Sequence, residues 1–253
     1  MSGALKASFK HFLSSLLIVG ALGFFIIAVW YPWPYYELLN VSKLIFLMLV
    51  VDVVCGPLLT FIVWNSGKSR KEKNFDLSVI VLLQISAACY GLNTAANGRP
   101  VYLVYEVDRM IVVTASEIDY NELPKAEAHF QRLSWTGPRV IGTRAPANSD
   151  EKLKSIELSM AGLEPSLRPG WWQDYSKSVP DAISRSMAIS DLKPSAMDSR
   201  AIFEKELGGL KHARDEIRWL PMVSSKGANW VVLINKNSGL PIGYINVNGF
   251  DLI

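Results

Sequence analysis

One ionisable side chain interrupts a long apolar stretch of the sequence. Asp52 is the only charged residue between Lys43 and Lys68, within a run of mostly aliphatic residues long enough to cross a bilayer. A carboxyl group at bilayer depth costs about 2.5 to 3.5 kcal/mol on insertion scales, so it usually has a polar partner or a function. Two interpretations are open. Asp52 is either hydrogen-bonded within a helix bundle or in contact with the membrane helix of another protein.

The residues after Asp52 should distort its helix. Gly56 and Pro57 follow at short distance, and Pro57 lacks the N–H that would bond to the carbonyl of Val53. We therefore expect a kink next to the carboxyl group. A kinked helix with a polar side chain would offer a docking notch to a second helix.

The depth of Asp52 predicts its partners within a bundle. At 1.5 Å per residue, Asp52 lies roughly 12 Å below the outer end of its apolar segment. The same depth falls near Gly23 on the preceding segment and near Ser86 on the following one. Gln84, Ser86 and Tyr90 are the polar side chains near that level, so they are the candidate hydrogen-bond partners.

No catalytic or metal-binding arrangement accompanies Asp52. An intramembrane aspartyl protease needs two acidic residues that meet inside the membrane, but Asp76 lies at the edge of the third apolar segment. The histidines at positions 11, 129 and 212 lack metal-ligand spacing, and neither a Gly-x-Ser-x-Gly elbow nor a phosphate-binding glycine loop occurs. We expect a protein that is not an enzyme and that needs no cofactor or metal.

Three apolar segments could hold these residues in a membrane. Residues 12–31 are 20 residues without a charge, enough to cover about 30 Å of hydrocarbon as a helix. Residues 44–64 contain Asp52, and residues 77–94 form a third, more polar segment. A cleavable signal peptide is the alternative for the first segment, but that segment exceeds a signal h-region and no small-x-small cleavage site follows. We therefore expect a transmembrane domain, residues 1–94, and a second domain, residues 95–253.

Basic residues in the short loops predict the orientation. Six Lys and Arg residues stand before the first segment and between the second and third, whereas the remaining loop contributes one. Positive residues concentrate on the cytoplasmic side, so the N-terminus should be cytoplasmic and residues 95–253 should lie outside the cytoplasm. An aromatic cluster then falls at the outer interface, where an anchoring role is favoured over a ligand cage. Its members are Trp30, Tyr31, Trp33, Tyr35 and Tyr36.

The composition agrees with contact to a lipid bilayer. Hydrophobic residues make up 50% of the chain and charged residues 19%. Residues 95–253 carry 19 basic and 19 acidic residues without a long basic run, which argues against nucleic acid as a partner. Cys55 and Cys89 both lie in the apolar segments, so no disulfide framework is expected outside them.

The pattern beyond residue 95 predicts an α+β domain of antiparallel strands and helices. Predicted strands are residues 101–105, 110–114, 139–143, 217–223, 230–235 and 240–247, with a hairpin at the beginning and a meander at the end. Predicted helices are residues 122–133, a helix from 149 or 150 that ends at Gly162, and one over 199–207 that ends at Gly208-Gly209. Residues 171–194 have no clear assignment.

Five residues are candidate surface features of this domain. Arg99 stands where the chain leaves the third apolar segment, and Asp108 and Arg109 lie at the turn of the first hairpin. They could fix the posture of the domain. Trp171 and Trp172 follow a Pro-Gly pair, and core packing is favoured for them over contact with a partner.

Several short segments together resemble the TfpX/TfpZ family of type IV pilin accessory proteins. In chain order they are residues 29–32 (VWYP), 51–60 (VDVVCGPLLT), 75–77 (FDL), 99–104 (RPVYLV), 108–109 (DR), 137–139 (GPR), 218–221 (RWLP) and 230–234 (WVVLI). The likeness extends along the whole chain and is densest from residue 29 to residue 114.

The resemblance implies a bacterial inner-membrane accessory protein or chaperone with a periplasmic domain. Its expected partner is a type IV pilin, which has one membrane helix and a head outside the cytoplasm, and other pilus assembly membrane proteins could share the interface. The expected contact or bundle residues are Asp52, Gly56, Pro57, Ser86 and Tyr90. The alternatives are an envelope enzyme and a membrane sensor, although a sensor would need a recruited partner because the cytoplasmic pieces are short.

Overall fold

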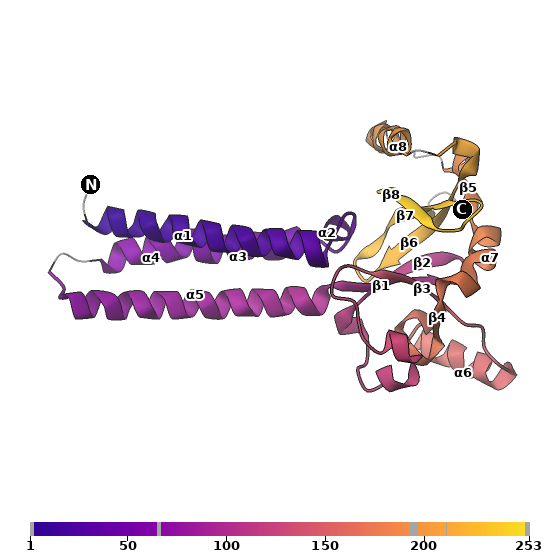
Figure 1. Cartoon of the computed structure of the whole chain (residues 1–253), viewed down its shortest axis with the longest axis horizontal. Helices are drawn as coiled ribbons and strands as arrows, with labels where there is room; N and C mark the ends of the chain where they lie inside the picture. Colours follow the sequence, from indigo (N-terminus) through magenta and orange to yellow (C-terminus); the bar gives the residue numbers. More distant parts are fainter. Residues whose placement is uncertain (1–2, 65–66, 193–196, 211, 251–253) are drawn as a thin grey trace. The chain divides into compact units, whose positions relative to one another are not determined.

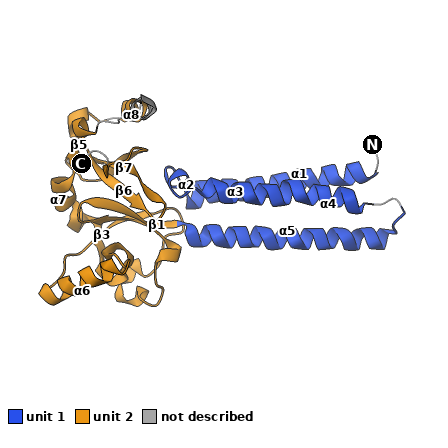
Figure 2. Cartoon of the chain, turned by 180° about the vertical axis from the view of Figure 1, so that it is seen from behind, with its two compact units in different colours: residues 1–99 blue, residues 100–253 orange. Residues whose placement is uncertain are grey.

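Two compact units make up the protein. The computed structural model describes residues 3–64, 67–192, 197–210 and 212–250. Unit 1 is Met1–Arg99 and unit 2 is Pro100–Ile253 (Figure 2). The three apolar helices lie in unit 1, and the sheet lies in unit 2, so each unit has its own architecture.

Unit 1 contains three helices that are long and apolar enough to cross a membrane, as predicted (Figure 1). The first consists of α1 (Gly3–Phe25) and a π-helical turn (Ile26–Trp30), and the short α2 (Tyr35–Leu38) follows it. The second consists of α3 (Val41–Leu49), a π-helical segment (Val50–Cys55) and α4 (Gly56–Val63). The third is α5 (Arg70–Gly98).

The second helix is the centre of the bundle, because α1 and α5 both pack against it. Helix α5 comes close at Gly91, where an added Cβ would lie 2.7 Å from the sulfur of Met48. Helix α5 begins at a capping box in which Ser69 and Glu72 bond to each other's backbone N–H groups.

Unit 2 is built on one mixed sheet in the order β4-β3-β1-β2-β6-β7-β8, with β5 paired to β6. The strands are β1 (Pro100–Glu106), β2 (Arg109–Thr114), β3 (Arg139–Thr143), β4 (Trp172–Asp174), β5 (Met187–Ala188), β6 (Ile217–Ser224), β7 (Gly227–Asn235) and β8 (Pro241–Ile245). The predicted hairpin β1–β2 and the predicted meander β6–β7–β8 are confirmed. Two pairings are parallel rather than antiparallel, β1 with β3 and β2 with β6, because long crossovers bring β3 and β6 alongside the hairpin.

The helices of unit 2 are α6 (Ser149–Met160), α7 (Tyr175–Arg185) and α8 (Met197–Gly209). Helices α6 and α8 occupy predicted helical segments, whereas α7 lies in the stretch without an assignment. The predicted helix over residues 122–133 is wrong, since that stretch forms two 3₁₀ turns, Leu123–Lys125 and Ala128–Phe130. Its carbonyls bond elsewhere: Tyr102 donates to Phe130 O at 3.0 Å, and Arg139 donates to His129 O and Arg132 O.

Two clusters of buried hydrophobic side chains lie among the described residues of unit 2. One contains Tyr102, Phe130 and Trp172, and the other contains Trp219. Trp219 Nε1 donates to Ala188 O at 3.0 Å, which links β6 to the last residue of β5. Two of the segments that carry the family resemblance, residues 99–104 and 218–221, therefore contribute side chains to the core of unit 2.

Candidate functional site in the membrane helices

Pro57 changes the backbone register next to Asp52. The Gly56 N–H bonds to Val51 O, five residues back, as in a π-helix. In that register the next donor would be Pro57 to the Asp52 carbonyl, but proline has no N–H. The Gln84 amide supplies the missing donor, with Nε2 lying 2.9 Å from Asp52 O. The π-helical register therefore leaves the Asp52 carbonyl without a backbone donor. The sequence had predicted this for the carbonyl of Val53, one residue later.

A chain of hydrogen bonds continues from Gln84 across the bundle. Gln84 Oε1 lies 2.7 Å from His11 Nε2, and His11 Nδ1 lies 2.6 Å from Thr60 Oγ1. Because the Asp52 carbonyl only accepts, it orients the Gln84 amide so that Oε1 faces His11. His11 Nε2 then donates to Gln84 Oε1, and His11 Nδ1 shares the other hydrogen bond with the Thr60 hydroxyl. Ser8 adds a bond of 2.8 Å to the carbonyl of Pro57.

The carboxyl group of Asp52 is less well satisfied than its backbone. The residue is 4% exposed, and its Oδ1 atom has no hydrogen-bond partner among the described residues. Asp52 lines a groove with a volume of about 180 Å³, which we call the α1–α5 groove. Its walls include His11, Ser15 and Ile18 of α1 and Val81, Gln84 and Ile85 of α5.

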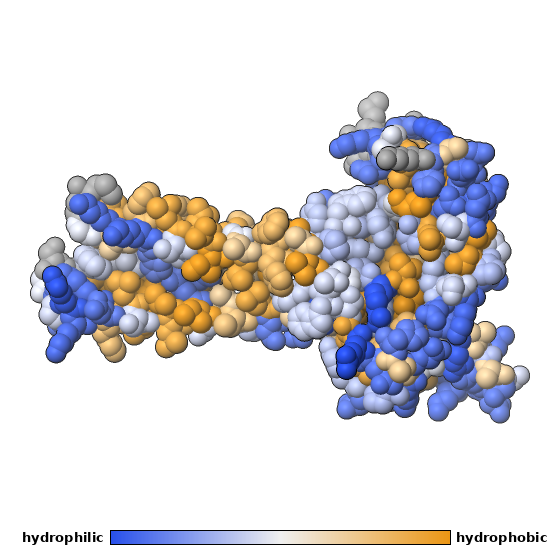
Figure 3. Space-filling view, in the orientation of Figure 1, coloured by the Kyte–Doolittle hydropathy of each residue, from blue (hydrophilic) through white to orange (hydrophobic). Residues whose placement is uncertain are grey.

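Besides Asp52, four polar side chains line the groove within an otherwise apolar surface, those of His11, Ser14, Ser15 and Gln84. Figure 3 shows hydrophilic side chains between α1 and α5 toward the N-terminal end of α1, with apolar side chains around them. A second cavity of about 670 Å³ extends along the same two helices and shares His11, Ser14 and Val81 with the groove. Lys6 and Lys10 lie at its end.

The structure brings one of the three predicted partners to Asp52. Gln84 is in contact, but the Ser86 hydroxyl donates to Leu82 O within its own helix, and Tyr90 is 73% exposed. Gly56, in the next turn, lies against the Gln84 amide, which an added Cβ would displace. His11, Thr60 and Ser8 were missed by the sequence analysis.

The five aromatic residues divide into inward and outward groups. The Tyr31 hydroxyl donates to Ala95 O at 2.9 Å, and Trp30 packs edge-on against Phe25 with ring centroids 5.0 Å apart. Trp30, Tyr31 and Tyr35 are buried, which does not suit the predicted role as lipid anchors. Trp33 is exposed and Tyr36 is partly exposed, so they can still meet an interface.

The predicted surface residues near the start of unit 2 are held locally. Arg99 is buried and donates to Ala96 O at the end of α5. Arg109 pairs with Asp108 at 2.7 Å, and its guanidinium lies 5.1 Å from the ring centre of Phe250. These contacts give both charged side chains of the turn a structural role.

The two tryptophans have different environments. Trp172 is buried and its Nε1 donates to Ser166 O at 2.8 Å, as core packing predicts. Trp171 is half-buried between two guanidinium groups, with Arg144 at 4.5 Å and Arg168 at 5.2 Å from its ring centre. Arg144 also pairs with Glu151 at 2.6 Å.

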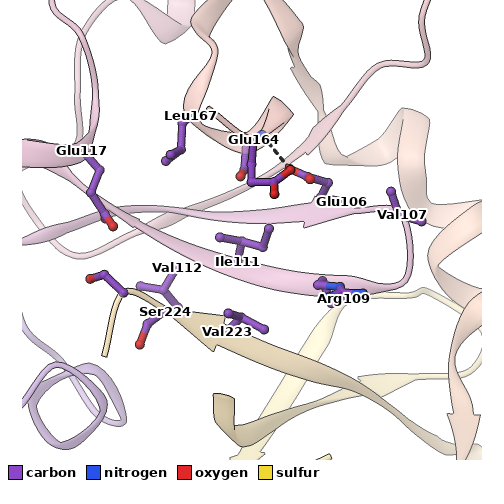
Figure 4. Close-up of a pocket in the computed structure, with 12 residues that line it drawn as sticks. Glu106, Val107, Arg109, Ile111, Val112, Glu117, Glu164, Leu167, Val223 and Ser224 are labelled. Atoms are coloured by element: carbon purple, nitrogen blue, oxygen red, sulfur yellow. Dashed lines mark hydrogen bonds between the residues drawn. The ribbon is translucent and has the colours of Figure 1, made fainter. Parts of the chain in front are cut away.

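Unit 2 has an acidic cavity of about 430 Å³ that sequence reasoning missed (Figure 4). Glu106, Glu117 and Glu164 line it together with Arg109. The Ser166 N–H donates to Glu106 at 2.6 Å. Burial nevertheless raises the pKa of the Glu106 carboxyl, an effect that the nearby Glu164 reinforces and the Ser166 hydrogen bond opposes.

One exposed group in unit 2 has donors spaced for a metal ion. Glu127, His129 and Asp174 offer ligand atoms within 4.8 Å of one another. His129 already lies 3.1 Å from Asp174 and 3.8 Å from Glu127, and Lys177 lies 3.6 Å from Glu127. These contacts with one another and with Lys177 hold the three side chains in place.

Three candidate membrane helices with a buried polar cluster, followed by an α+β domain, define a membrane-associated protein with a separately folded second unit. The sequence is 34% identical over 98% of this chain to the fimbrial assembly protein, serogroup I, of Dichelobacter nodosus, covering 97% of that relative. It is 32% identical to the serogroup E1 protein of the same organism, over 98% of this chain and 97% of the relative. The sequence pattern described as fimbrial assembly protein FimB matches residues 1–40.

The chain therefore belongs to the FimB family of fimbrial assembly proteins. A third relative, the fimbrial assembly protein of D. nodosus serogroups C1 and C2, is 43% identical over 49% of this chain and 94% of its own length. No solved structure matches this chain.

Proposed function

We propose that this protein is an inner-membrane accessory protein, or chaperone, that binds a type IV pilin and supports its stability or its delivery to the assembly machinery. The observation that carries the proposal is the likeness to two fimbrial assembly proteins over 98% of the chain. The resemblance to the TfpX/TfpZ family of pilin accessory proteins supports the narrower assignment to a pilin.

The predicted topology supports a pilin as the partner. Six basic residues favour a cytoplasmic N-terminus, which would place unit 2 in the periplasm. A pilin before assembly has one membrane helix and a head outside the cytoplasm. The two proteins could then lie side by side, with helix next to helix and domain next to head.

The side chains described above favour binding over catalysis. The buried cluster around Asp52 contains one carboxyl group, and its histidine is held between Thr60 and Gln84. An aspartyl protease needs a second carboxyl group beside the first. We therefore assign the protein a binding role without chemistry of its own.

Deletion of the gene tests this function. Total pilin and surface-exposed pilin are measured in the parent, in the deletion strain and in the strain complemented with the full chain. A pilin chaperone predicts that surface pilin falls in the deletion strain and returns on complementation. Equal total and surface amounts in all three strains would contradict the proposal.

A further inference from the structure

We infer that the α1–α5 groove is a seat for one transmembrane helix of the client pilin, and that this helix places a hydrogen-bond donor opposite Asp52. The inference rests on the proposed function and adds the site and the chemistry of the contact. Three observations lead to it: the orphaned carboxyl oxygen, the shape of the groove and the spacing of its walls.

The first observation is the unused acceptor. Asp52 Oδ1 is buried and has no partner among the described residues, although its neighbours His11, Gln84 and Thr60 are all engaged with one another. In a membrane, water does not replace a missing partner, so a buried polar oxygen is costly until a donor reaches it. A donor on another molecule that enters the groove would pair with this oxygen.

The second observation is the way in. Asp52 lines the groove, and the groove walls carry residues more than half exposed, Ile18 at 58% and Ile85 at 56%. The groove therefore opens on the side of the bundle, between two helices that both pack on the second helix. A ligand can approach it laterally from the lipid.

The third observation is the pattern on the walls. On α5 the lining positions are 81, 84, 85 and 88, and on α1 they are 11, 14, 15 and 18, with 19 beside them. Both sets follow the i, i+3, i+4, i+7 spacing of a helix face. Ser14, Ser15 and Ala88 are small, which lets a third helix approach closely. An apolar helix with one polar side chain matches such a surface, as in helix-in-groove recognition.

Site-specific photocrosslinking tests the seat in cells that make both proteins. A photoreactive phenylalanine analogue replaces Ile18 or Ile85 in the groove. The matched controls are Leu17 and Leu83, which are 76% and 62% exposed and do not line the groove. We expect a pilin adduct from both groove positions at ten or more times the yield of the controls. Equal yields from groove and control positions would overturn the inference.

Variants of Asp52 test the donor. Asp52→Asn keeps the Oδ1 acceptor, so the adduct from Ile18 should stay within about threefold of the parent, whereas Asp52→Leu should lose at least tenfold. An unchanged adduct in Asp52→Leu, or an equal loss in both variants, would overturn the hydrogen-bond assignment.

A groove-filling variant covers the case in which Asp52→Leu fails to accumulate. Ala88→Phe should abolish the adduct, whereas Leu83→Phe, on another face of α5, should not. Equal yields of the pilin adduct in the two variants would contradict binding of the pilin helix in the groove.

The outcomes separate the inference from the proposed function. If pilin adducts form only from the control positions, the groove is not the binding site, but the protein still binds pilin. If no position gives an adduct and surface pilin is normal after gene deletion, both the groove as binding site and the proposed pilin-binding function are contradicted.

Discussion

Single buried carboxyl groups have different roles in the two units. Asp52 faces the α1–α5 groove with one oxygen unsatisfied, whereas Glu106 in unit 2 accepts the N–H of Ser166. Glu151 is the opposite case, because its hydrogen bond to Arg144 lowers its pKa to about 2. Burial thus raises the pKa of Glu106, and pairing lowers that of Glu151.

The raised pKa of Glu106 predicts a pH-dependent effect of Glu106→Gln. Above the folded-state pKa, the ionised carboxyl destabilises the folded protein, and this penalty disappears as the pH falls to the ordinary value of 4.5, where the unfolded state also takes up the proton. The full-length variant should therefore have a higher Tm than the parent at pH 7. The gain should shrink as the pH falls toward 4.5 and be absent below that value, as measured by thermal unfolding in detergent. A Tm difference that does not change with pH would contradict this account.

The tryptophan pair predicts unequal costs. Trp172→Ala removes a buried ring that packs on Tyr102, with centroids 4.8 Å apart, and should lower the free energy of unfolding by about 3 to 5 kcal/mol. Trp171→Ala loses two cation–π contacts and should cost about 1 to 2 kcal/mol. Denaturant titration of both variants measures the difference, and equal losses would refute the assignment of Trp172 alone to the core.

At the scale of elements, the π-helical segment is the feature that makes the candidate site. Because of its register, the carbonyl that lacks a backbone donor is that of Asp52. The Gln84 side chain of α5 donates to this carbonyl instead. The contact depends on Gly56, because a Cβ there would occupy the place of the Gln84 amide.

This packing predicts that Gly56→Ala is more damaging than a glycine substitution elsewhere in the bundle. The added methyl group should displace Gln84 and lower the stability of the full chain by about 1 to 3 kcal/mol. Gly20→Ala is the matched control, since nothing lies within 4 Å of an added Cβ and the helix propensity of alanine favours the change. Thermal unfolding in detergent compares the two, and equal Tm values would contradict the packing.

The sequence predicted elements well where local patterns decide them. Long apolar stretches predicted the three long helices, and runs of β-branched and aromatic residues separated by turn residues predicted the hairpin and the meander. It failed at residues 122–133, where Arg139 bonds to the His129 carbonyl that a helix would have paired with the N–H of Leu133, and Tyr102 bonds to the Phe130 carbonyl. Such long-range contacts leave no local trace.

The candidate site was predicted only in part for a similar reason. Asp52 and Pro57 were identified from type and spacing, but the depth estimate assumed helices without relative shift. It placed Ser86 at the level that Gln84 occupies. His11 and Thr60 join the site through contacts 49 residues apart in sequence, which spacing alone does not reveal.

At the scale of the whole molecule, contact with a pilin depends on the membrane topology. The three apolar helices precede unit 2 in the chain, and the basic loop at residues 68–73 is predicted to stay in the cytoplasm. That arrangement would give unit 2 access to a pilin head and the helices access to a pilin helix.

Reporter fusions test the topology. Alkaline phosphatase fused after Ile253 should be active, because the enzyme folds only outside the cytoplasm, whereas the same reporter inserted in the loop at residues 67–69 should be inactive. Immunoblots control for intact fusions. An inactive intact fusion after Ile253 would place unit 2 in the cytoplasm and contradict the account.

Co-purification after crosslinking tests the central claim, that this protein binds a pilin in the membrane. The full chain is tagged, crosslinked in cells, solubilised in detergent and isolated, with an unrelated three-helix membrane protein as the control. The account predicts that pilin is recovered with this chain and not with the control. Recovery of a kinase or a transcriptional regulator without pilin would contradict it and favour a sensor.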